Sequence, residues 1–544
     1  MDNQKLYRFA PSTTAEPLIN SWPIWSDLLS PVPYSLHVAN YQLPLLRSYV
    51  DDPASHEEAA GNPELAGAPF ANVPARRHQE MRQFLEATER EHVDSIELAE
   101  ALNRFYDELV KTAKGQCLDE LYGKLPPLLR GRVELVYDYN CNPIVRTLEN
   151  FFYESPLYKP HLQSLRLLEQ KTDSSRPFFL NTPRLSEPDQ VAWQVPFDRE
   201  EIDMLFETEM TPSPVGFLRE LMGLKESDER VLTALLTSEA AAPPAEWNDE
   251  AVRIRYFGHA CVLVQTGGVS IMTDPWVSPR SSHGSLDHYS FDDLPQKIDF
   301  AVVTHGHHDH FVPETLLRLR KRIGCLIVPH ASGIFHADTS LRLAAQRLGF
   351  SHVVEVDPLD RISFGHGEII AAPFFGEHAD LAHCKSGYVV RAGGRQILFA
   401  ADSNCVDGVL YRNLRQSIGD VDTVFLGMEC VGAPLSWLYG ALMPFRLPRN
   451  LDQSRRTKAC DANAALTMLT ELGSSQAYVY AMGAEPWLEF RMGLGCSEES
   501  EQKTEAERFV DLCRHRGVAA QRLFAQHEVV LPAAAHASVA GVNK

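Results

Sequence analysis

The sequence predicts an α/β protein in two parts: a mixed α+β unit, then a layered unit of short strands and helices. Three observations predict this. Helical patterns are prominent in the first part of the chain. Residues 237–248 are rich in small residues and proline, and short apolar runs dominate the sequence after them. We therefore divide the chain into residues 1–236, a linker at 237–248, residues 249–532 and a mobile tail at 533–544.

The first unit has helical and strand patterns, but no spacing typical of metal ligands or of a nucleophile. Apolar residues from Leu98 to Val110 recur at helical intervals, and Asp94 and Ser95 just ahead of them can cap such a helix. Residues 132–139 resemble a strand. Residues 31–42 are polar and aromatic, and they end in turn-forming residues. This half is expected to be globular and rich in helix.

The second unit alternates short apolar runs with Gly, Asp and Pro. Many short strands with helices between them favour two sheets packed face to face, with helices outside. The expected helices are 313–322, 462–472 and 504–514. The expected strands are 252–257, 261–265, 269–273, 300–304, 325–328, 369–372, 388–391, 397–401, 423–426 and 477–481.

The composition excludes some functional classes. The net charge of −21 argues against nucleic-acid binding, which needs a basic face. No apolar run approaches the ~18 residues of a membrane span, and the N-terminus lacks the apolar core of a signal peptide. The ten cysteines are scattered without a CxxC pair, which is typical of reduced thiols. We expect a cytoplasmic protein that binds neither nucleic acid nor membrane.

A histidine-rich loop, His-Gly-His-His-Asp-His at residues 305–310, directly follows the strand expected at 300–304. Gly306 permits a tight turn, so the loop can aim His305 and His307 at one ion and Asp309 and His310 at a second. Imidazole ligands suit zinc, iron, manganese or cobalt, and the carboxylate adds hard character. The alternative is a surface turn rich in histidine by chance, which four histidines and one aspartate in six residues disfavour.

Acidic residues end other expected strands. Asp402 follows the strand at 397–401 in a position to bridge two ions, although such an aspartate is often only a turn former. Asp274 could hold a ligand histidine by a hydrogen bond, and a simple turn aspartate before Pro275 is equally consistent with the local sequence. Glu377 and His378 follow the strand at 369–372, and residue chemistry alone does not separate them as ligands.

Four segments resemble the metallo-β-lactamase superfamily in their order along the chain: residues 256–264, residues 273–276, the HxHxDH loop and residues 399–402. The resemblance covers residues 250–530 and implies an αββα sandwich with the metals at one rim. Ordinary members complete their two sites with a lone histidine after a strand and with a late histidine. Here Glu377 stands beside His378 at the first position, and the late region contains Glu485 rather than a histidine.

Carboxylates in place of histidines make a harder and more negative site, which favours iron over zinc. With its additional N-terminal half, including residues 33–42, the chain is similar to the di-iron β-hydroxylases of nonribosomal peptide assembly lines. That resemblance implies two iron ions, one held by His305, His307 and Glu377, the other by Asp309 and His310, with Asp402 bridging. The remaining candidates, Glu485, His378, Asp274 and His259, would then be outer ligands or supporting residues, and His308 would be structural.

The same resemblance implies a monooxygenase that hydroxylates the β-carbon of an amino acid tethered as a thioester to a peptidyl carrier domain. O2 and an external electron donor would be its co-substrates. The N-terminal half would cover the site and dock the carrier, and a homodimer is left open.

The alternatives to this function are a zinc-dependent hydrolase of the lactonase or phosphodiesterase type and a non-catalytic module with a vestigial site. Candidate pocket walls are Phe374, Phe375, residues 437–439 and Trp487, any one of which is more often core packing.

Overall fold

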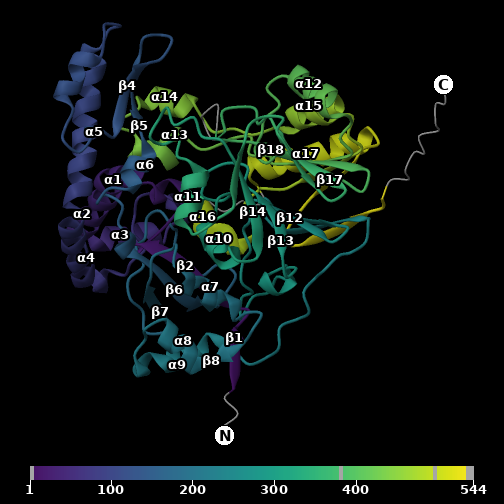
Figure 1. Ribbon diagram of the computed structural model, residues 1–544, viewed down its shortest axis with the longest axis horizontal. Helices are drawn as coiled ribbons and strands as arrows, with labels where there is room; N and C mark the ends of the chain where they lie inside the picture. The colour runs from purple at the N-terminus through teal and green to yellow at the C-terminus, as the bar shows by residue number, and fades with distance from the viewer. Residues whose placement is uncertain (1–4, 379–383, 494–498, 534–544) are drawn as a thin grey trace.

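The computed structural model describes residues 5–378, 384–493 and 499–533, and two seven-stranded sheets form its second half (Figure 1). The strand orders are β15-β14-β13-β12-β11-β10-β23 and β16-β17-β18-β19-β20-β21-β22. The first sheet contains β10 (Val252–Gly258), β11 (Cys261–Thr266), β12 (Val269–Thr273), β13 (Ile298–Val302), β14 (Ile323–Pro329), β15 (Val353–Val356) and β23 (His527–Leu531). The second contains β16 (Arg361–Phe364), β17 (Gly367–Ala372), β18 (Gly387–Ala392), β19 (Arg395–Phe399), β20 (Thr423–Leu426), β21 (Gln476–Val479) and β22 (Ala519–Arg522).

Apolar side chains fill the space between the two sheets. Ile271 and Val302 of the first sheet share one buried core with Val390 and Phe399 of the second. The helices α12 (Gly408–Ile418), α15 (Ala462–Leu472) and α17 (Glu501–His515) cover the outer face of the second sheet (Figure 1). The helices α10 (Pro313–Leu319) and α11 (Leu341–Arg347) pack on the first sheet from the other side. The predicted αββα sandwich is therefore confirmed.

The N-terminal half combines helices with small antiparallel sheets. Its four-stranded sheet has the order β3-β2-β6-β7, a second sheet has the order β8-β1-β9, and β4 pairs with β5. The strands are β1 (Leu6–Phe9), β2 (Thr13–Ile19), β3 (Trp22–Pro23), β4 (Val133–Tyr137), β5 (Pro143–Thr147), β6 (Gln163–Glu169), β7 (Val191–Gln194), β8 (Ser213–Pro214) and β9 (Leu236–Thr237). The helices are α1 (Pro31–His37), α2 (Leu43–Asp51), α3 (Pro53–Ala60), α4 (His78–Glu91), α5 (Val93–Thr112), α6 (Glu149–Tyr153), α7 (Glu200–Glu207), α8 (Val215–Leu221) and α9 (Glu229–Ala234).

Residues 31–42 differ from the expectation of a segment ending in a turn. They form α1 and a π-helical turn (Val38–Gln42) that continues directly into α2. Pro31 starts α1, where its missing N–H leaves no helical hydrogen bond unmade. The Tyr34 hydroxyl is buried and lies 2.8 Å from His92 Nε2, so the aromatic residues of this segment pack inward. The helix expected from Leu98 and the strand expected at 132–139 are present as α5 and β4.

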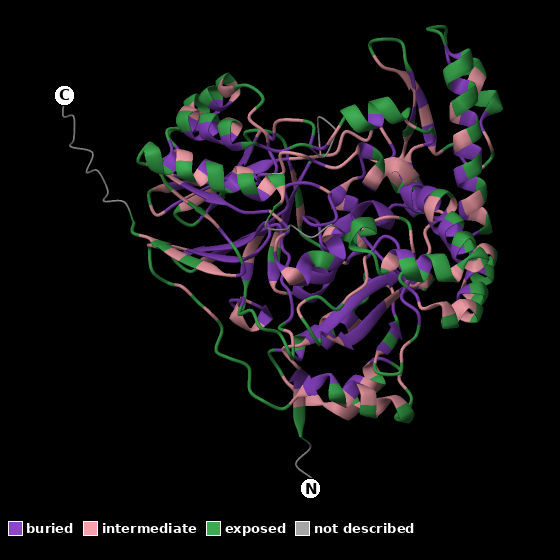
Figure 2. Cartoon of the chain, turned by 180° about the vertical axis from the view of Figure 1, so that it is seen from behind, coloured by how far each residue is buried: buried purple, intermediate pink, exposed green. Residues whose placement is uncertain are grey.

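The two halves share one hydrophobic core. Trp25 and Phe179 of the N-terminal half belong to the same buried cluster as Leu316 and Leu326 of the second half. In Figure 2 buried residues run through the strands of both halves, and exposed residues lie on the outer faces of helices and on loops. The expected linker at 237–248 falls mainly between β9 and β10, in a stretch without helix or strand. The tail expected at 533–544 lies outside the described residues beyond position 533.

The described residues bear on two expectations from the composition, the free cysteines and the lack of a membrane span. The nine cysteines within them are free thiols, as their scattered spacing predicts. Of the helices in the same ranges, none combines the length and the apolar character that crossing a membrane requires.

Candidate metal centre

Several chain segments meet at one edge of the sandwich and bring histidines and carboxylates together. The loop at 305–310 follows β13, which ends at Val302 rather than at the expected residue 304. Asp402 follows β19 and His378 follows β17, both in the second sheet. His259 lies in the turn between β10 and β11, with a φ of 48°. The site is thus built from both sheets at once.

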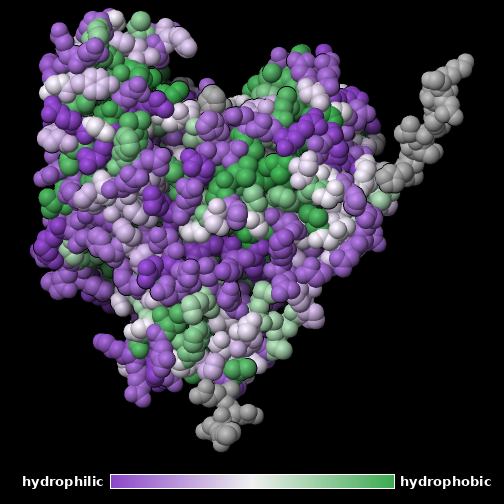
Figure 3. All heavy atoms as spheres, viewed as in Figure 1, coloured by the Kyte–Doolittle hydropathy of each residue, from purple (hydrophilic) through white to green (hydrophobic). Residues whose placement is uncertain are grey.

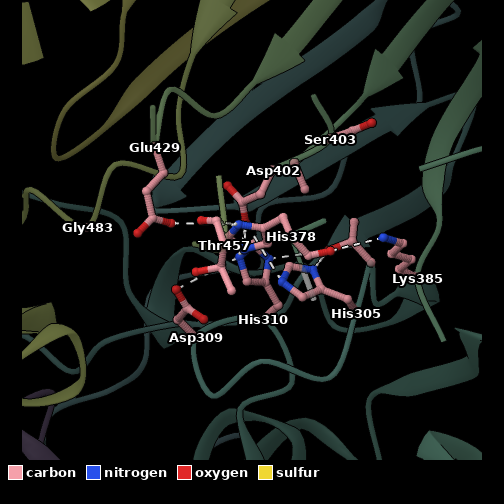
Figure 4. A network of polar contacts seen from close by, with 12 residues as sticks. His305, Asp309, His310, His378, Lys385, Asp402, Ser403, Glu429, Thr457 and Gly483 are labelled. Carbon is pink, nitrogen blue, oxygen red and sulfur yellow. Dashed lines mark hydrogen bonds and ion pairs between the residues drawn. The ribbon is translucent and has the colours of Figure 1, made fainter. Parts of the chain in front are cut away.

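The ligand-type atoms form overlapping groups in which all atoms lie within 4.8 Å of one another. These groups are His305 with His307 and His378, His259 with Asp309 and His310, and His305 with His310 and Asp402. The Asp402 carboxylate lies 2.9 Å from His310 Nε2, 3.3 Å from His378 Nε2 and 3.8 Å from His305 Nε2 (Figure 4). Asp402 therefore lies between the group of His305, His307 and His378 and the group of His259, Asp309 and His310. A ligand shared by two metal ions would need this position.

Contacts on the outer nitrogens orient the imidazole rings. The Thr304 hydroxyl lies 3.0 Å from His305 Nδ1, and the Asp274 carboxylate lies 2.9 Å from His310 Nδ1. His378 Nδ1 donates to the Thr457 carbonyl oxygen at 3.3 Å. These contacts leave the Nε2 atoms facing the cluster, as supporting hydrogen bonds do in metal sites.

Several inward-facing atoms have no hydrogen-bond partner among the described residues: His305 Nε2, His307 Nε2 and Asp309 Oδ1. A buried polar group without a partner costs roughly 1–3 kcal/mol, and a bound cation would satisfy these atoms. Burial, together with the neighbouring imidazoles, holds the pKa of His305 and of His307 well below the ordinary value. Both rings are therefore neutral, which is the form that binds metals. The residues fit a pair of metal ions.

Asp274 supports this cluster from behind. It is fully buried, and its carboxylate accepts hydrogen bonds from the Thr304 amide at 2.7 Å and from the Thr304 hydroxyl at 2.8 Å. Although burial opposes a charge on His310, the carboxylates of Asp274, Asp309 and Asp402 raise the pKa of that imidazole well above its usual value. Asp274 thus fixes both the orientation and the basicity of His310.

We expect Asp274→Asn to weaken metal binding about 10–100-fold, because an amide is a poorer acceptor for the His310 Nδ1 proton. Metal retention against a chelator, measured in the purified variant, checks this. The matched control is Asp420→Asn, at an exposed aspartate that pairs with Arg415 at 2.7 Å. Equal metal retention in wild type and Asp274→Asn would contradict the expectation.

Glu377 and His378 point in different directions. The Glu377 side chain is 66% exposed and lies 3.7 Å from Arg455 Nε, whereas the His378 side chain is 4% exposed and faces Asp402. Both residues lie in a bend that begins at Gly376, whose φ is 94°, and in this bend only His378 faces the cluster. The geometry here therefore places His378, and not Glu377, beside His305 and His307.

The other candidates also occupy definite positions. His259 Nε2 lies 3.2 Å from the Asp309 carboxylate, a distance at which His259 orients that carboxylate, and His259 forms one ligand-type group with Asp309 and His310. Glu485 accepts a hydrogen bond from the Tyr256 hydroxyl and belongs to none of the ligand groups formed by the described residues. His308 turns away: its Nε2 donates to the Arg491 carbonyl oxygen at 3.0 Å.

The N-terminal half contacts the metal loop directly. The Ser26 hydroxyl donates to the Gly306 carbonyl oxygen. A Cβ at residue 306 would lie 3.3 Å from Ser26 Oγ and 3.3 Å from Leu341, and the φ of Gly306 is not in the left-handed region. Glycine therefore eases this close approach, and its φ is not one that the turn suggested by the sequence would reserve for glycine. Phe179, also N-terminal, stacks on His308 with a centroid distance of 4.9 Å.

A cavity of about 460 Å³ opens onto the metal cluster. His307, Asp309, His378 and Asp402 form its polar floor, and Leu435, Trp437, Leu438, Tyr439, Met482 and Met492 contribute apolar walls. Residues 437–439 thus line the cavity as suggested by their composition. Phe374, Phe375 and Trp487 are not among its lining residues, and Trp487 stacks on His288 with a centroid distance of 4.1 Å.

Glu429 also lines the cavity, and no motif in the sequence pointed to it. It follows β20, which pairs in parallel with β19. Because parallel strands end at the same edge of a sheet, Glu429 reaches the same edge as Asp402. One sequence signal could have identified Glu429. It is an acidic residue shortly after β20, the strand that neighbours the strand preceding Asp402.

Comparisons with known proteins agree with these features. Residues 8–240 match the diiron non-heme beta-hydroxylase N-terminal domain, and residues 270–479 match the beta-lactamase superfamily domain. The 4-amino-L-phenylalanyl-[CmlP-peptidyl-carrier-protein] 3-hydroxylase of Streptomyces venezuelae is 36% identical over 95% of this chain and 98% of its own. The crystal structure of CmlA, a diiron beta-hydroxylase from Streptomyces venezuelae, aligns with a TM-score of 0.90, 33% identity and coverage of 97% of this chain and 100% of that one. A metal-dependent hydrolase of Anoxybacillus flavithermus is 23% identical over only 32% of this chain and 72% of its own.

Proposed function

Because this chain belongs to the diiron non-heme β-hydroxylase family, we propose that it hydroxylates the β-carbon of an amino acid held as a thioester on a peptidyl carrier domain. The observation that carries the proposal is the full-length match to a carrier-dependent 3-hydroxylase, together with a buried histidine–carboxylate cluster that opens onto a cavity. The reaction inserts one oxygen atom of O2 into a C–H bond. Two electrons from an external donor and two protons reduce the other oxygen atom to water.

Two iron ions would supply the O2 chemistry. We assign His305, His307 and His378 to one ion in the conformation described, with Glu377 as the alternative third ligand that the family resemblance implies. Asp309 and His310 would hold the other ion, with His259 beside them and Asp402 between the two. The apolar cavity walls would exclude water and hold the substrate side chain against the cluster.

A zinc-dependent hydrolase is the second candidate, and less supports it. The hydrolase match covers about a third of the chain, and the beta-lactamase superfamily domain matches residues 270–479 alone. The N-terminal half contributes Ser26 and Phe179 to the surroundings of the metal loop, so it is part of the site. A vestigial module is opposed by the several inward-facing ligand atoms that lack other partners.

The rim of the cavity supports the carrier as the partner. Residues 446–458 carry five basic side chains and one acidic one in a chain whose net charge is −21: Arg446, Arg449, Arg455, Arg456, Lys458 and Asp452. Asp452 is buried and accepts hydrogen bonds from Ser436, so the exposed charge of the segment is positive. Helix α14 (Arg449–Ser454) packs on α13 (Leu435–Tyr439), which lines the cavity.

This basic rim, residues 446–458, also exposes apolar surface. Phe445 is 41% exposed just ahead of it, and Leu451 on α14 is 53% exposed. In Figure 1 α14 lies at the upper edge between α5 and α12, and Figure 3 shows that the outline of the molecule is hollowed there. A peptidyl carrier delivers its cargo on a phosphopantetheine arm, whose phosphodiester is an anion that guanidinium groups bind well.

We expect the double variant Arg446→Glu and Arg449→Glu to raise the KM for loaded carrier about tenfold while kcat stays near the wild-type value. Reversing rim charges slows association and reduces the salt dependence of the encounter. Steady-state kinetics at several salt concentrations measure both effects. The control Arg514→Glu, on the exposed face of α17, should leave KM unchanged. An unchanged KM in the double variant would exclude this rim as the docking surface.

The function itself is tested with iron-loaded enzyme, aminoacyl-loaded carrier protein, a reductant and O2. Mass spectrometry of the carrier should show a gain of one oxygen atom on the tethered amino acid, and no gain when O2 is omitted. Cleavage of the thioester without O2, by enzyme purified with zinc, would establish the hydrolase alternative instead.

A further inference from the structure

Two aromatic side chains in the wall of the metal cavity contact both halves of the chain. They are Trp437 and Tyr439 of α13, and both line the cavity. The Tyr439 ring centroid lies 5.9 Å from that of His307, in the metal loop, and 6.1 Å from that of Trp25, in the N-terminal half. Trp25 is fully buried, so it is a fixed support for the Tyr439 ring. The wall of the cavity is thus supported partly by the N-terminal half.

Trp437 has the same kind of surroundings. Its ring centroid lies 5.8 Å from that of His308, in the metal loop, and 6.1 Å from that of Phe178, which belongs to the N-terminal half. The planes of the Trp437 and Phe178 rings are inclined by 31°. Gly67 approaches the indole from the N-terminal half as well, since a Cβ there would lie 3.5 Å from Trp437 Nε1. The N-terminal half therefore determines how the two wall rings are oriented beside the metal loop.

We propose that Phe178 and Trp25 are positioning residues that set the substrate specificity of the cavity through Trp437 and Tyr439. The inference rests on the proposed function, in which the cavity receives the side chain of the tethered amino acid. Packed aromatic rings hold one another in tilted or offset arrangements, so a wall ring that loses its supporting ring is free to turn. A turned ring changes the width of the cavity next to the metal cluster, whereas the metal ligands stay in place. The second half thus supplies the chemistry, and the N-terminal half selects the side chain.

The same wall indicates an aromatic substrate side chain. Leu435, Leu438 and Met492 complete its apolar surface. A charged side chain against these groups would lose its hydration without gaining an ion pair, and a thioether contacts aromatic rings favourably. In an aromatic amino acid Cβ is bonded directly to the ring. A ring seated against Tyr439 therefore keeps Cβ close to His307, whose own ring centroid lies 5.9 Å from that of Tyr439.

The test measures binding and turnover of carrier protein loaded with L-phenylalanine, with L-leucine or with L-glutamate. We expect the wild type to prefer the phenylalanyl carrier over the leucyl carrier and to bind the glutamyl carrier most weakly. Phe178→Leu should lower the phenylalanyl-to-leucyl ratio of kcat/KM about tenfold, the lower end of what a small change of shape in an apolar pocket costs. The preference in dissociation constants should weaken likewise, with unchanged metal content. Trp25→Phe, checked for folding by thermal unfolding, should lower the kcat/KM ratio as well.

Two comparisons separate this role from a general structural one. Tyr106 of α5 stacks on Phe445 at a centroid distance of 5.5 Å, also between the two halves, but neither ring lines the cavity. Tyr106→Leu is therefore the matched control and should leave the ratio unchanged. If Phe178 acts through Trp437, Phe178→Leu should have no further effect on the ratio in a Trp437→Leu background, since residues in contact give non-additive effects. Unloaded carrier, which has no side chain to select, should bind wild type and Phe178→Leu equally.

The outcomes distinguish the inference from the proposed function. A binding preference that depends on Phe178 and Trp437, without oxygen insertion into any carrier, keeps the inference and removes the hydroxylase proposal. Oxygen insertion with the same ratio in wild type and Phe178→Leu keeps the hydroxylase and overturns the role of Phe178. That role is also overturned by an equal shift in Tyr106→Leu, by additive effects of Phe178→Leu and Trp437→Leu, or by loss of metal in Phe178→Leu. Equal binding of the phenylalanyl and leucyl carriers by the wild type would overturn the aromatic substrate class.

Discussion

Asp402→Asn is expected to remove most of the bound iron and to lower hydroxylation by more than ~100-fold, beyond the usual effect of a supporting residue. The Asp402 carboxylate lies within 3.8 Å of the inward nitrogens of His305, His310 and His378. Nearby imidazoles hold its pKa below the ordinary value although burial alone would raise it, so it remains an anion. An asparagine keeps the shape but loses the charge that joins the two ligand sets.

Iron quantification and single-turnover hydroxylation measure this effect, and thermal unfolding shows whether the variant is folded. The matched control is Asp407→Asn in the same loop, where the carboxylate caps α12 by accepting from the Val409 amide at 2.9 Å. That variant should lose at most about 1–2 kcal/mol of stability and no iron. A folded Asp402→Asn enzyme with full iron content would show that Asp402 does not bridge the metals.

The second half of the fold could be predicted because its signals are local. The runs at 269–273 and 423–426 coincide with β12 and β20, and the helical pattern at 462–472 coincides with α15. Each run is a buried strand or an amphipathic helix bounded by turn residues, so its period alone identifies it. The edge strands β15 and β22 were missed because they are half-exposed and lack a continuous apolar run.

The N-terminal half and part of the site could not be predicted in this way. The turn-forming residues at the end of residues 31–42 suggested a turn, although residues 38–42 continue the chain from α1 into α2 as a π-helical turn. Glu377 and His378 are consecutive, and neither composition nor spacing says which of the two faces inward. The position of Glu429 depends on which strands pair in the second sheet, and a single sequence does not state that pairing.

Glu16→Gln is expected to lower the free energy of unfolding by about 3–5 kcal/mol, because it leaves buried guanidinium groups without their counter-ion. The Glu16 side chain is fully buried and pairs with Arg166, Arg176 and Arg184 at 2.5, 2.7 and 3.1 Å. Although burial raises the pKa of this carboxyl, the three guanidinium groups hold it well below its usual range. Glu16 is therefore charged, and its removal leaves positive charge buried in the N-terminal half.

The effect should reach the catalytic half, because Arg176 also pairs with Glu314 of α10 at 2.7 Å and its guanidinium lies 3.7 Å from the ring centroid of Phe490. We therefore expect Glu16→Gln to lower the midpoint of a single unfolding transition that both halves share. Calorimetry measures this. Glu89→Gln, at an exposed pair with Arg47, should cost at most about 1 kcal/mol. Two separate transitions, with only the first one shifted, would mean that the halves unfold independently and that the shared core does not couple the N-terminal half to the metal loop.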